Sequence, residues 1–136
     1  MTAGYSGTPL AKKLGIKPGS VVSVLNDPGN FLELADPMPS GVTIRTSARG
    51  KAEMVVLFTK SRSELSRRLD TLGRMVYPDG AVWVCWPKRA SKVPTDMTED
   101  VVRAEALPRG LVDVKVCAID ATWSGLKVVW RRELRQ

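Results

Sequence analysis

Apolar residues in this sequence gather into short runs, separated by polar segments that contain most of the prolines and glycines. The runs predict six β-strands, at residues 21–25, 42–46, 53–58, 81–86, 112–120 and 126–132. The runs at 53–58 and 81–86 are almost wholly apolar, which is typical of strands covered on both faces. The run at 42–46 alternates between apolar and polar residues, which indicates a more exposed strand.

Helical patterns lie between several of these runs. Between residues 65 and 76, leucines and a valine recur at helical spacing. Ser61 and Glu64 precede this segment as a capping box, in which the serine hydroxyl caps the helix and the glutamate reaches back to the serine backbone. Thr8 and Thr98 are expected to cap two further helices. Residues 31–34 predict one or two helical turns.

Strands and helices alternate along the chain, and the last two strands are joined by a short link. This order predicts an α/β fold with a three-layer, open, mostly parallel sheet on a shortened Rossmann-like plan, ending in an antiparallel hairpin. The 136 residues match the commonest domain size and contain no repeat or linker. We therefore expect residues 1–136 to form a single domain.

The composition excludes several kinds of chemistry. Histidine is absent, so a Ser-His-Asp triad cannot form within the chain, and we expect no metal site. Cys85 and Cys117 each lie inside an apolar run, where buried reduced thiols are expected. No apolar run approaches the ~20 residues of a membrane span, and the chain start lacks the apolar region of a signal peptide. We expect a cytoplasmic protein that has no membrane partner.

The chain has a net charge of +7, from 21 basic and 14 acidic residues. This balance favours an anionic partner, such as nucleic acid, a phosphorylated small molecule or an acidic protein surface. A positively charged but merely soluble surface is the alternative. Nucleic acid would be bound by scattered basic residues, namely Lys12, Lys13, Arg45, Arg49, Lys51, Arg67, Arg68, Arg131 and Arg132. No recognisable nucleic-acid motif accompanies them.

Two stretches resemble a family of short bacterial proteins known only as a domain of unknown function. The first is GYSGTPLAKKLGIKPG, at residues 4–19. The second, within residues 86–127, comprises WPK, TEDVVR, LPRGLVDVKVCAID and TWSGLK. The resemblance implies no activity, because none is assigned to the family.

The middle of the chain is similar, more distantly, to the class I methyltransferase fold. EMVVLF, the helix that follows and PDGAVWVCWPK resemble the fold's fourth strand, its helix and its fifth strand, and the terminal hairpin resembles its last two strands. In that fold, several glycines follow the first strand, whereas the loop at residues 26–30 has one. Arg45-Thr46-Ser47 stands where an acidic residue usually holds the ribose. We therefore expect no cofactor, with S-adenosylmethionine as the alternative.

Ligands of open α/β sheets lie beyond the carboxyl ends of the strands. The loops expected there supply the candidate ligand-binding residues, namely Asn26, Asp27, Gly29, Lys60, Ser61, Trp86, Lys88, Arg89 and Lys92. The basic side chains among them suit a phosphate or a carboxylate, and Trp86 suits stacking on a base. A solvated basic loop is the alternative.

Trp123 belongs to a turn expected at residues 121–125, and Asp120 ends the strand just before it. A tryptophan in an exposed turn is a candidate contact for a protein partner, although it can equally fold back as a lid on neighbouring strands.

No nucleophile–base arrangement is visible in the sequence. The leading interpretation is therefore an uncharacterised, non-catalytic binding or regulatory module, with a basic site for an anionic ligand or a protein partner. A small methyltransferase-like enzyme dependent on S-adenosylmethionine is the first alternative, and a nucleic-acid-binding protein is the second.

Overall fold

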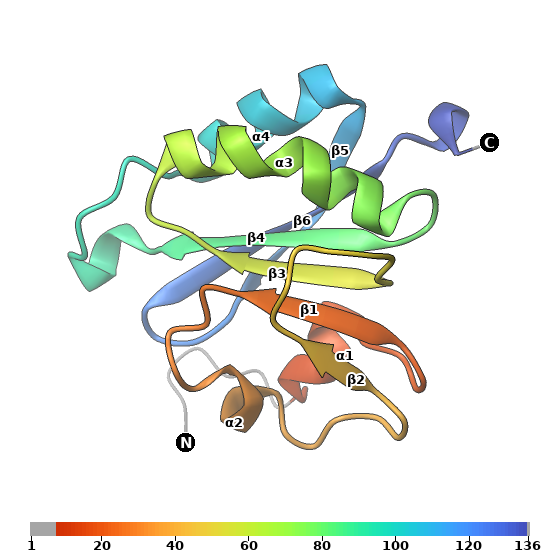
Figure 1. The fold of residues 1–136 in the computed structure, drawn as a ribbon. Helices are drawn as coiled ribbons and strands as arrows, with labels where there is room; N and C mark the ends of the chain where they lie inside the picture. Colours follow the sequence, from red (N-terminus) through yellow and green to blue (C-terminus); the bar gives the residue numbers. More distant parts are fainter. Residues whose placement is uncertain (1–7, 136) are drawn as a thin grey trace.

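A computed structural model describes residues 8–135 of the chain, which form a six-stranded sheet in the order β2-β1-β3-β4-β6-β5 (Figure 1). The strands are β1 (Val21–Leu25), β2 (Thr43–Arg45), β3 (Met54–Phe58), β4 (Ala81–Pro87), β5 (Leu111–Ala118) and β6 (Trp123–Trp130). Strands β1 to β4 are parallel, and β6 runs antiparallel to both β4 and β5. The predicted fold class is confirmed.

Helices cover both faces of the sheet (Figure 1). The α-helices are α1 (Leu10–Leu14), α2 (Phe31–Ala35), α3 (Arg62–Val76) and α4 (Glu99–Ala106), and single 3₁₀ turns occupy Arg89–Ser91, Leu107–Arg109 and Arg132–Leu134. Helices α3 and α4 share one buried cluster with the sheet, and α1 and α2 share another. Strand β4 serves both clusters, because Trp83 faces α1 while Val82 and Val84 face α3.

The start of α1 differs from the sequence prediction. Pro9 occupies the cap position with an extended backbone, and no side chain caps the helix, so Thr8 does not have its expected role. The helix ends as predicted at Gly15, whose φ of +87° is left-handed. Trp83 Nε1 donates to the carbonyl of Leu14 at 2.9 Å, which holds this short helix against the buried sheet.

The terminal hairpin also corrects two sequence expectations. Apolar residues alternate with others along residues 112–120, a pattern typical of a strand with one buried face, but Val114 and Val116 have exposed fractions of 54% and 48%. A register shift between Asp113 and Lys115 breaks the alternation, as bulges do in edge strands. Strand β6 begins at Trp123, two residues inside the expected turn, because the actual turn lies at residues 119–122.

The order of the strands locates a topological switch point. From β1 the chain passes to β2 on one side and then crosses to β3 on the other side of β1. Crossovers of opposite direction leave a crevice beyond the carboxyl ends of β1 and β3, where open α/β sheets bind ligands. Among residues 8–135, no helix is long and apolar enough to cross a membrane.

Candidate functional site

A cavity of about 470 Å³ lies at this switch point, and we call it the edge cavity. It is lined by Asn26, Pro28, Phe58, Thr59, Lys60, Ser61, Glu64 and Trp123. These residues come from the loop after β1, the end of β3, the start of α3 and the start of β6. The volume lies within the range of small-molecule sites.

The loop after β1 is held in a defined shape. Asn26 has a left-handed φ of +58°, which asparagine tolerates better than most residues. Its Nδ2 donates to the carbonyl of Phe58 at 3.0 Å and to Glu64 Oε2 at 2.9 Å. Asp27 Oδ1 accepts from the backbone N–H groups of Gly29 and Phe31. Side chains of this loop therefore replace the usual run of glycines in fixing its path beside β3.

The carboxylate of Glu64 does not make the contact that the capping box predicts. Ser61 Oγ accepts from Glu64 N as a capping box requires, at 3.2 Å. The glutamate does not reach back to Ser61, whose N–H donates to Thr59 Oγ1 instead. Its carboxylate accepts from Thr59 Oγ1 at 2.6 Å and from Asn26, and it pairs with Arg68 at 3.3 Å. The loop after β1 competes for the carboxylate, and a local motif cannot reveal this.

The charge state of Glu64 follows from these contacts. Partial burial alone would raise the pKa of Glu64, but the hydrogen bonds from Thr59 and Asn26 and the charge of Arg68 outweigh it. The pKa therefore lies below its ordinary value. A negative charge stands in the cavity wall at neutral pH.

Aromatic rings form the other wall. Phe58 and Trp123 meet edge to face, with their ring centroids 5.1 Å apart. Trp123 is only 9% exposed, so the structure places it folded back on the sheet, as the second of its two sequence alternatives proposed. Asp120 Oδ1 accepts from the N–H groups of Thr122 and Trp123, at 2.8 Å each, and thereby shapes the turn. Contact of these two residues with a partner stays a prediction.

A second cavity, of about 490 Å³, lies beyond the end of β4. Trp86, Arg89 and Lys92 line it, together with residues that lead into α4. Trp86 packs in the α3 cluster, whereas Phe58 and Trp123 of the edge cavity pack in the α1 cluster. The apolar residues that line the two cavities therefore belong to opposite faces of the sheet.

The structure thus divides the predicted site residues into two groups. Asn26, Lys60 and Ser61 line the edge cavity, and Trp86, Arg89 and Lys92 line the second cavity. The remaining three, namely Asp27, Gly29 and Lys88, are not among the lining residues of either cavity.

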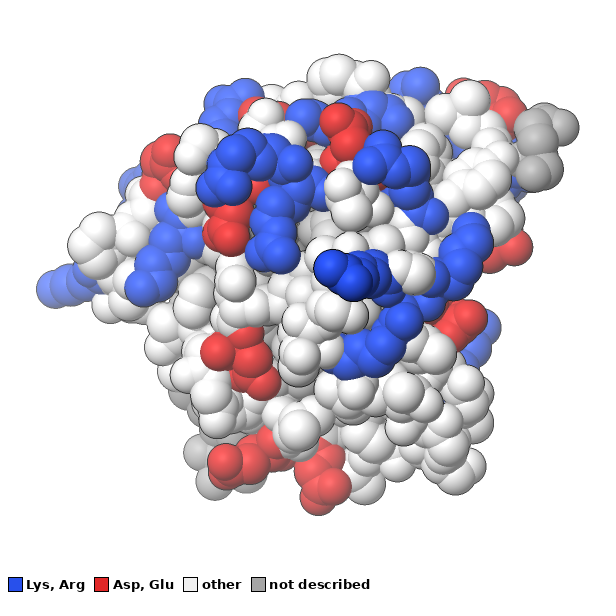
Figure 2. All heavy atoms as spheres, in the orientation of Figure 1, with Lys and Arg blue, Asp and Glu red and all other residues white. Residues whose placement is uncertain are grey.

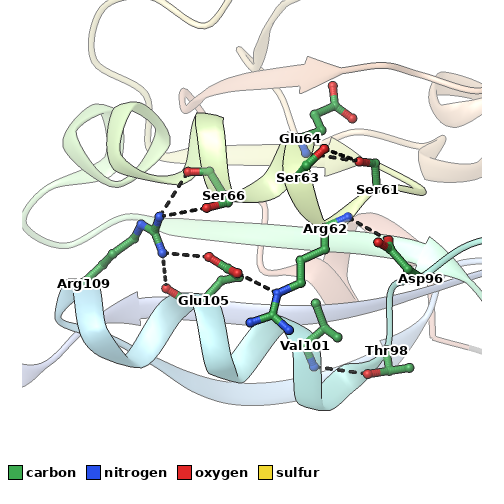
Figure 3. Close-up of polar contacts among 10 residues, drawn as sticks. All are labelled: Ser61, Arg62, Ser63, Glu64, Ser66, Asp96, Thr98, Val101, Glu105 and Arg109. Atoms are coloured by element: carbon green, nitrogen blue, oxygen red, sulfur yellow. Dashed lines mark hydrogen bonds and ion pairs between the residues drawn. The ribbon is translucent and has the colours of Figure 1, made fainter.

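Polar contacts at the start of α3 keep the two cavities apart. Asp96 Oδ1 accepts from the N–H of Arg62 at 2.8 Å (Figure 3). Thr95 Oγ1 donates to the carbonyl of Lys60 at 2.7 Å. Arg62 and Arg109 both pair with Glu105 and tie α3 to α4 (Figure 3). These contacts therefore hold the start of α3 in place between the linings of the two cavities.

The end of β2 carries a cation, at the position where the resemblance to the methyltransferase fold implied an acidic residue. Arg45 is the last residue of β2, and its guanidinium donates to the carbonyl of Lys51. The acidic partner expected for a ribose is therefore absent from this strand end. Among the described residues, no group of three or more acidic or cysteine side chains could hold a metal ion.

Comparison of the fold shows which solved structures resemble the chain. A methyltransferase dependent on S-adenosylmethionine, from Aquifex aeolicus, has a TM-score of 0.60 and 13% identity, and the match covers 86% of this chain and 85% of that one. The ribosomal protein L11 methylase of Lactobacillus delbrueckii subsp. bulgaricus gives 0.59 and 11%, over 90% and 75% of the two chains. Magnesium protoporphyrin IX methyltransferase from Synechocystis PCC 6803, with bound S-adenosylmethionine, gives 0.58 and 11%, over 90% and 74%.

At these identities the likeness establishes the fold. The six-stranded sheet with its helices is a methyltransferase-like Rossmann fold. Neither a protein-family model nor a curated protein sequence matches the chain, so its resemblance to short bacterial proteins stays an expectation.

Two sequence-based interpretations need correction. We expected a non-catalytic module and no cofactor, because the loop after β1 lacks glycines. Most of the solved structures compared above or found with them are methyltransferases, and one of these, magnesium protoporphyrin IX methyltransferase, was solved with S-adenosylmethionine and with S-adenosylhomocysteine bound. The leading interpretation was therefore wrong, and the comparison favours the methyltransferase alternative. The glycine count misled because the hydrogen bonds of Asn26 and Asp27 can fix the same loop.

Proposed function

We propose that this protein is a methyltransferase that binds S-adenosylmethionine in the edge cavity. The observation that carries the proposal is the position of this cavity, at the carboxyl ends of β1 and β3, where the strand order reverses. When bound, S-adenosylmethionine supplies an electrophilic methyl group on a positively charged sulfur, and the carbon–sulfur bond breaks as an acceptor's lone pair takes the methyl group.

The cavity lining suits the charged half of this molecule. An ionised carboxylate has about four lone-pair sites, and three donors already occupy the carboxylate of Glu64, so one position remains for a cation. The rings of Phe58 and Trp123 also line the cavity, and aromatic rings attract cations such as a sulfonium. The exposed ammonium of Lys60 suits the carboxylate of a bound amino acid.

The lining also restricts the acceptor. Glu64 is the only carboxylate that lines the edge cavity, and its lowered pKa makes it a weak proton acceptor. We therefore expect an acceptor atom that is nucleophilic without help from a general base, such as a thiolate or an aromatic ring nitrogen.

Titration calorimetry with S-adenosylhomocysteine tests the cofactor site directly. We expect micromolar binding, and at 100 times the dissociation constant the ligand should stabilise the fold by about 2.7 kcal/mol. Lys60→Ala should weaken binding at least tenfold, because it removes a charge-assisted hydrogen bond. Arg89→Ala, which removes the same charge from the second cavity, should leave binding unchanged. Absence of heat and of thermal stabilisation would refute the proposal, and equal losses in the two variants would misplace the site.

We also propose that the protein is located in the cytoplasm. Cys85 and Cys117 are both buried free thiols. Burial raises the pKa of the Cys85 thiol, which keeps it protonated and unreactive. Two reduced cysteines support a reducing compartment.

A further inference from the structure

The loop that follows β2 lies alongside helix α3. Residues 46–53 run along the α3 side of the sheet before entering β3 (Figure 1). Ala48, Gly50 and Lys51 of the loop line a shallow cavity of about 290 Å³ together with residues of α3, namely Thr71, Arg74 and Met75. Loop and helix therefore form one continuous surface.

This surface carries five basic residues, which we call the basic face: Arg45, Arg49, Lys51, Arg67 and Arg74. Figure 2 shows Lys and Arg side chains gathered over the loop and α3, while the charged side chains around α2 on this side are acidic. Every ion pair among the described residues involves other cations, so no carboxylate lies within 4.0 Å of a charged nitrogen of the basic face.

The carboxylates nearest to the basic face along the chain are engaged elsewhere. Glu64 pairs with Arg68, and Asp70 pairs with Arg109. Glu53, at the end of the loop, accepts from the N–H of Val21. Glu64 also feels the charge of Arg67, but without forming an ion pair with it, so among the described residues no carboxylate is paired with the basic face.

Hydrogen bonds fix the shape of the loop before any ligand arrives. The guanidinium of Arg45 donates to the carbonyl of Lys51, and Lys51 Nζ donates to the carbonyl of Tyr77 at 2.7 Å. An ammonium has three donors and a guanidinium five, so both groups keep donors for a ligand. A shaped surface loses less entropy on binding than a mobile one.

We propose that the basic face binds the phosphate backbone of a nucleic acid. Four of its five cations are arginines, whose planar forks match phosphate oxygens. Arg67 and Arg74 lie seven residues apart on α3, about 10 Å along its axis, so the face can contact several phosphates of one strand. The large apolar residues that are exposed, namely Leu32, Leu107, Val114, Val116 and Leu134, all lie outside it, which disfavours a lipid surface or an apolar protein interface. This binding goes beyond methyl transfer and does not depend on it.

Fluorescence anisotropy of the full chain with a labelled, mixed-sequence, single-stranded RNA tests the proposal. Five phosphate contacts predict that affinity falls about 100-fold between ~50 and ~200 mM salt. The triple variant Arg49→Ala, Arg67→Ala, Arg74→Ala should lose at least tenfold in affinity at low salt, and its salt slope should fall by about two.

The matched control replaces Lys12, Lys13 and Lys17 with alanine. These residues lie in or beside α1, on the other side of the sheet, and their loss changes the net charge equally. The control should bind RNA as the unmodified chain does. Equal losses in both triple variants would reduce the effect to net charge and overturn the proposal, as would an affinity that ignores salt. Binding to phosphatidylserine vesicles but not to RNA would also overturn it and assign the face to a lipid surface.

Discussion

Glu64 shows how one residue can be predicted correctly for its helix and wrongly for its contacts. Its backbone N–H meets Ser61 as the capping box requires, because that contact is set by three adjacent positions. Its carboxylate turns to Asn26 and Thr59, and these contacts depend on how β1 and β3 pair. Sequence reasoning gave the helix and the loop, whereas the long-range hydrogen bonds required the assembled sheet.

Glu64→Gln should lower the free energy of unfolding at pH 7 by about 1–3 kcal/mol. The uncharged amide cannot form the ion pair with Arg68, and its NH₂ group would face the NH₂ group of Asn26, so that two donors meet. The folded pKa of Glu64 is lowered, so the contribution of its charge is fully present above the ordinary value of 4.5 and is lost as pH falls through the folded pKa. Urea unfolding at pH 7 and at pH 3 measures the difference, which should shrink at pH 3. A difference that is equal at both pH values would contradict this account.

Ser23 is a buried polar residue at the centre of β1. It is fully buried, its Oγ has no hydrogen-bond partner among the described residues, and it lies beside Arg45 in the register of β1 and β2. An unpaired buried hydroxyl costs stability, so Ser23→Ala should unfold at an equal or higher urea concentration, with a gain of up to ~1 kcal/mol. A loss above ~1 kcal/mol would mean that the hydroxyl has a partner. Ser20→Ala is the contrasting variant, because Ser20 Oγ donates to the backbone carbonyl of Lys17 at 2.7 Å. Loss of this hydrogen bond should destabilise the fold.

At the scale of elements, β6 depends on a glycine between two cysteines. Gly125 lies opposite Cys85 on β4 and Cys117 on β5. A Cβ at this position would approach Trp83 Cε3 to 3.1 Å and Cys85 Sγ to 3.2 Å. Gly125→Ala should therefore destabilise by about 1–3 kcal/mol through overpacking.

A double-mutant cycle separates overpacking from a strand effect. Cys85→Ala removes one of the crowding atoms, so the cost of Gly125→Ala should be smaller in that background. Thermal or urea unfolding of the four proteins measures the coupling. An unchanged cost would mean that Cys85 does not resist the added methyl group.

The terminal hairpin shows where periodicity stops being informative. Alternation predicted strands at 112–120 and 126–132, and both strands exist. It could not show the bulge between Asp113 and Lys115, nor that Asp120 closes a tight turn that lets β6 begin at Trp123. The bulge arises from pairing between strands and the turn from local hydrogen bonds of one side chain, and a pattern of apolar and polar residues reports neither.

For the whole molecule, the sequence predicted which edge of the sheet carries the candidate site but not how its residues divide between cavities. Parallel strands had to bring Asn26, Lys60 and Trp86 to one edge, and they do. The face of the sheet to which each side chain points depends on the residue at which its strand ends. The predicted residues are therefore divided between two cavities. The function was misjudged for a related reason: counting glycines assumes one way to shape a loop, and here side chains shape it.

We also propose that the chain forms one domain, because both buried clusters share strands of a single sheet. Leu14 and Leu72 are fully buried on opposite faces, and the four tryptophans are divided between the two sides. Leu14→Ala and Leu72→Ala should each cost about 2–5 kcal/mol. If the faces unfold together, each variant should shift tryptophan fluorescence and far-ultraviolet circular dichroism to the same lower urea midpoint. Midpoints that separate in either variant would show that one face can unfold while the other persists, and the chain would then be two cooperative units around one sheet.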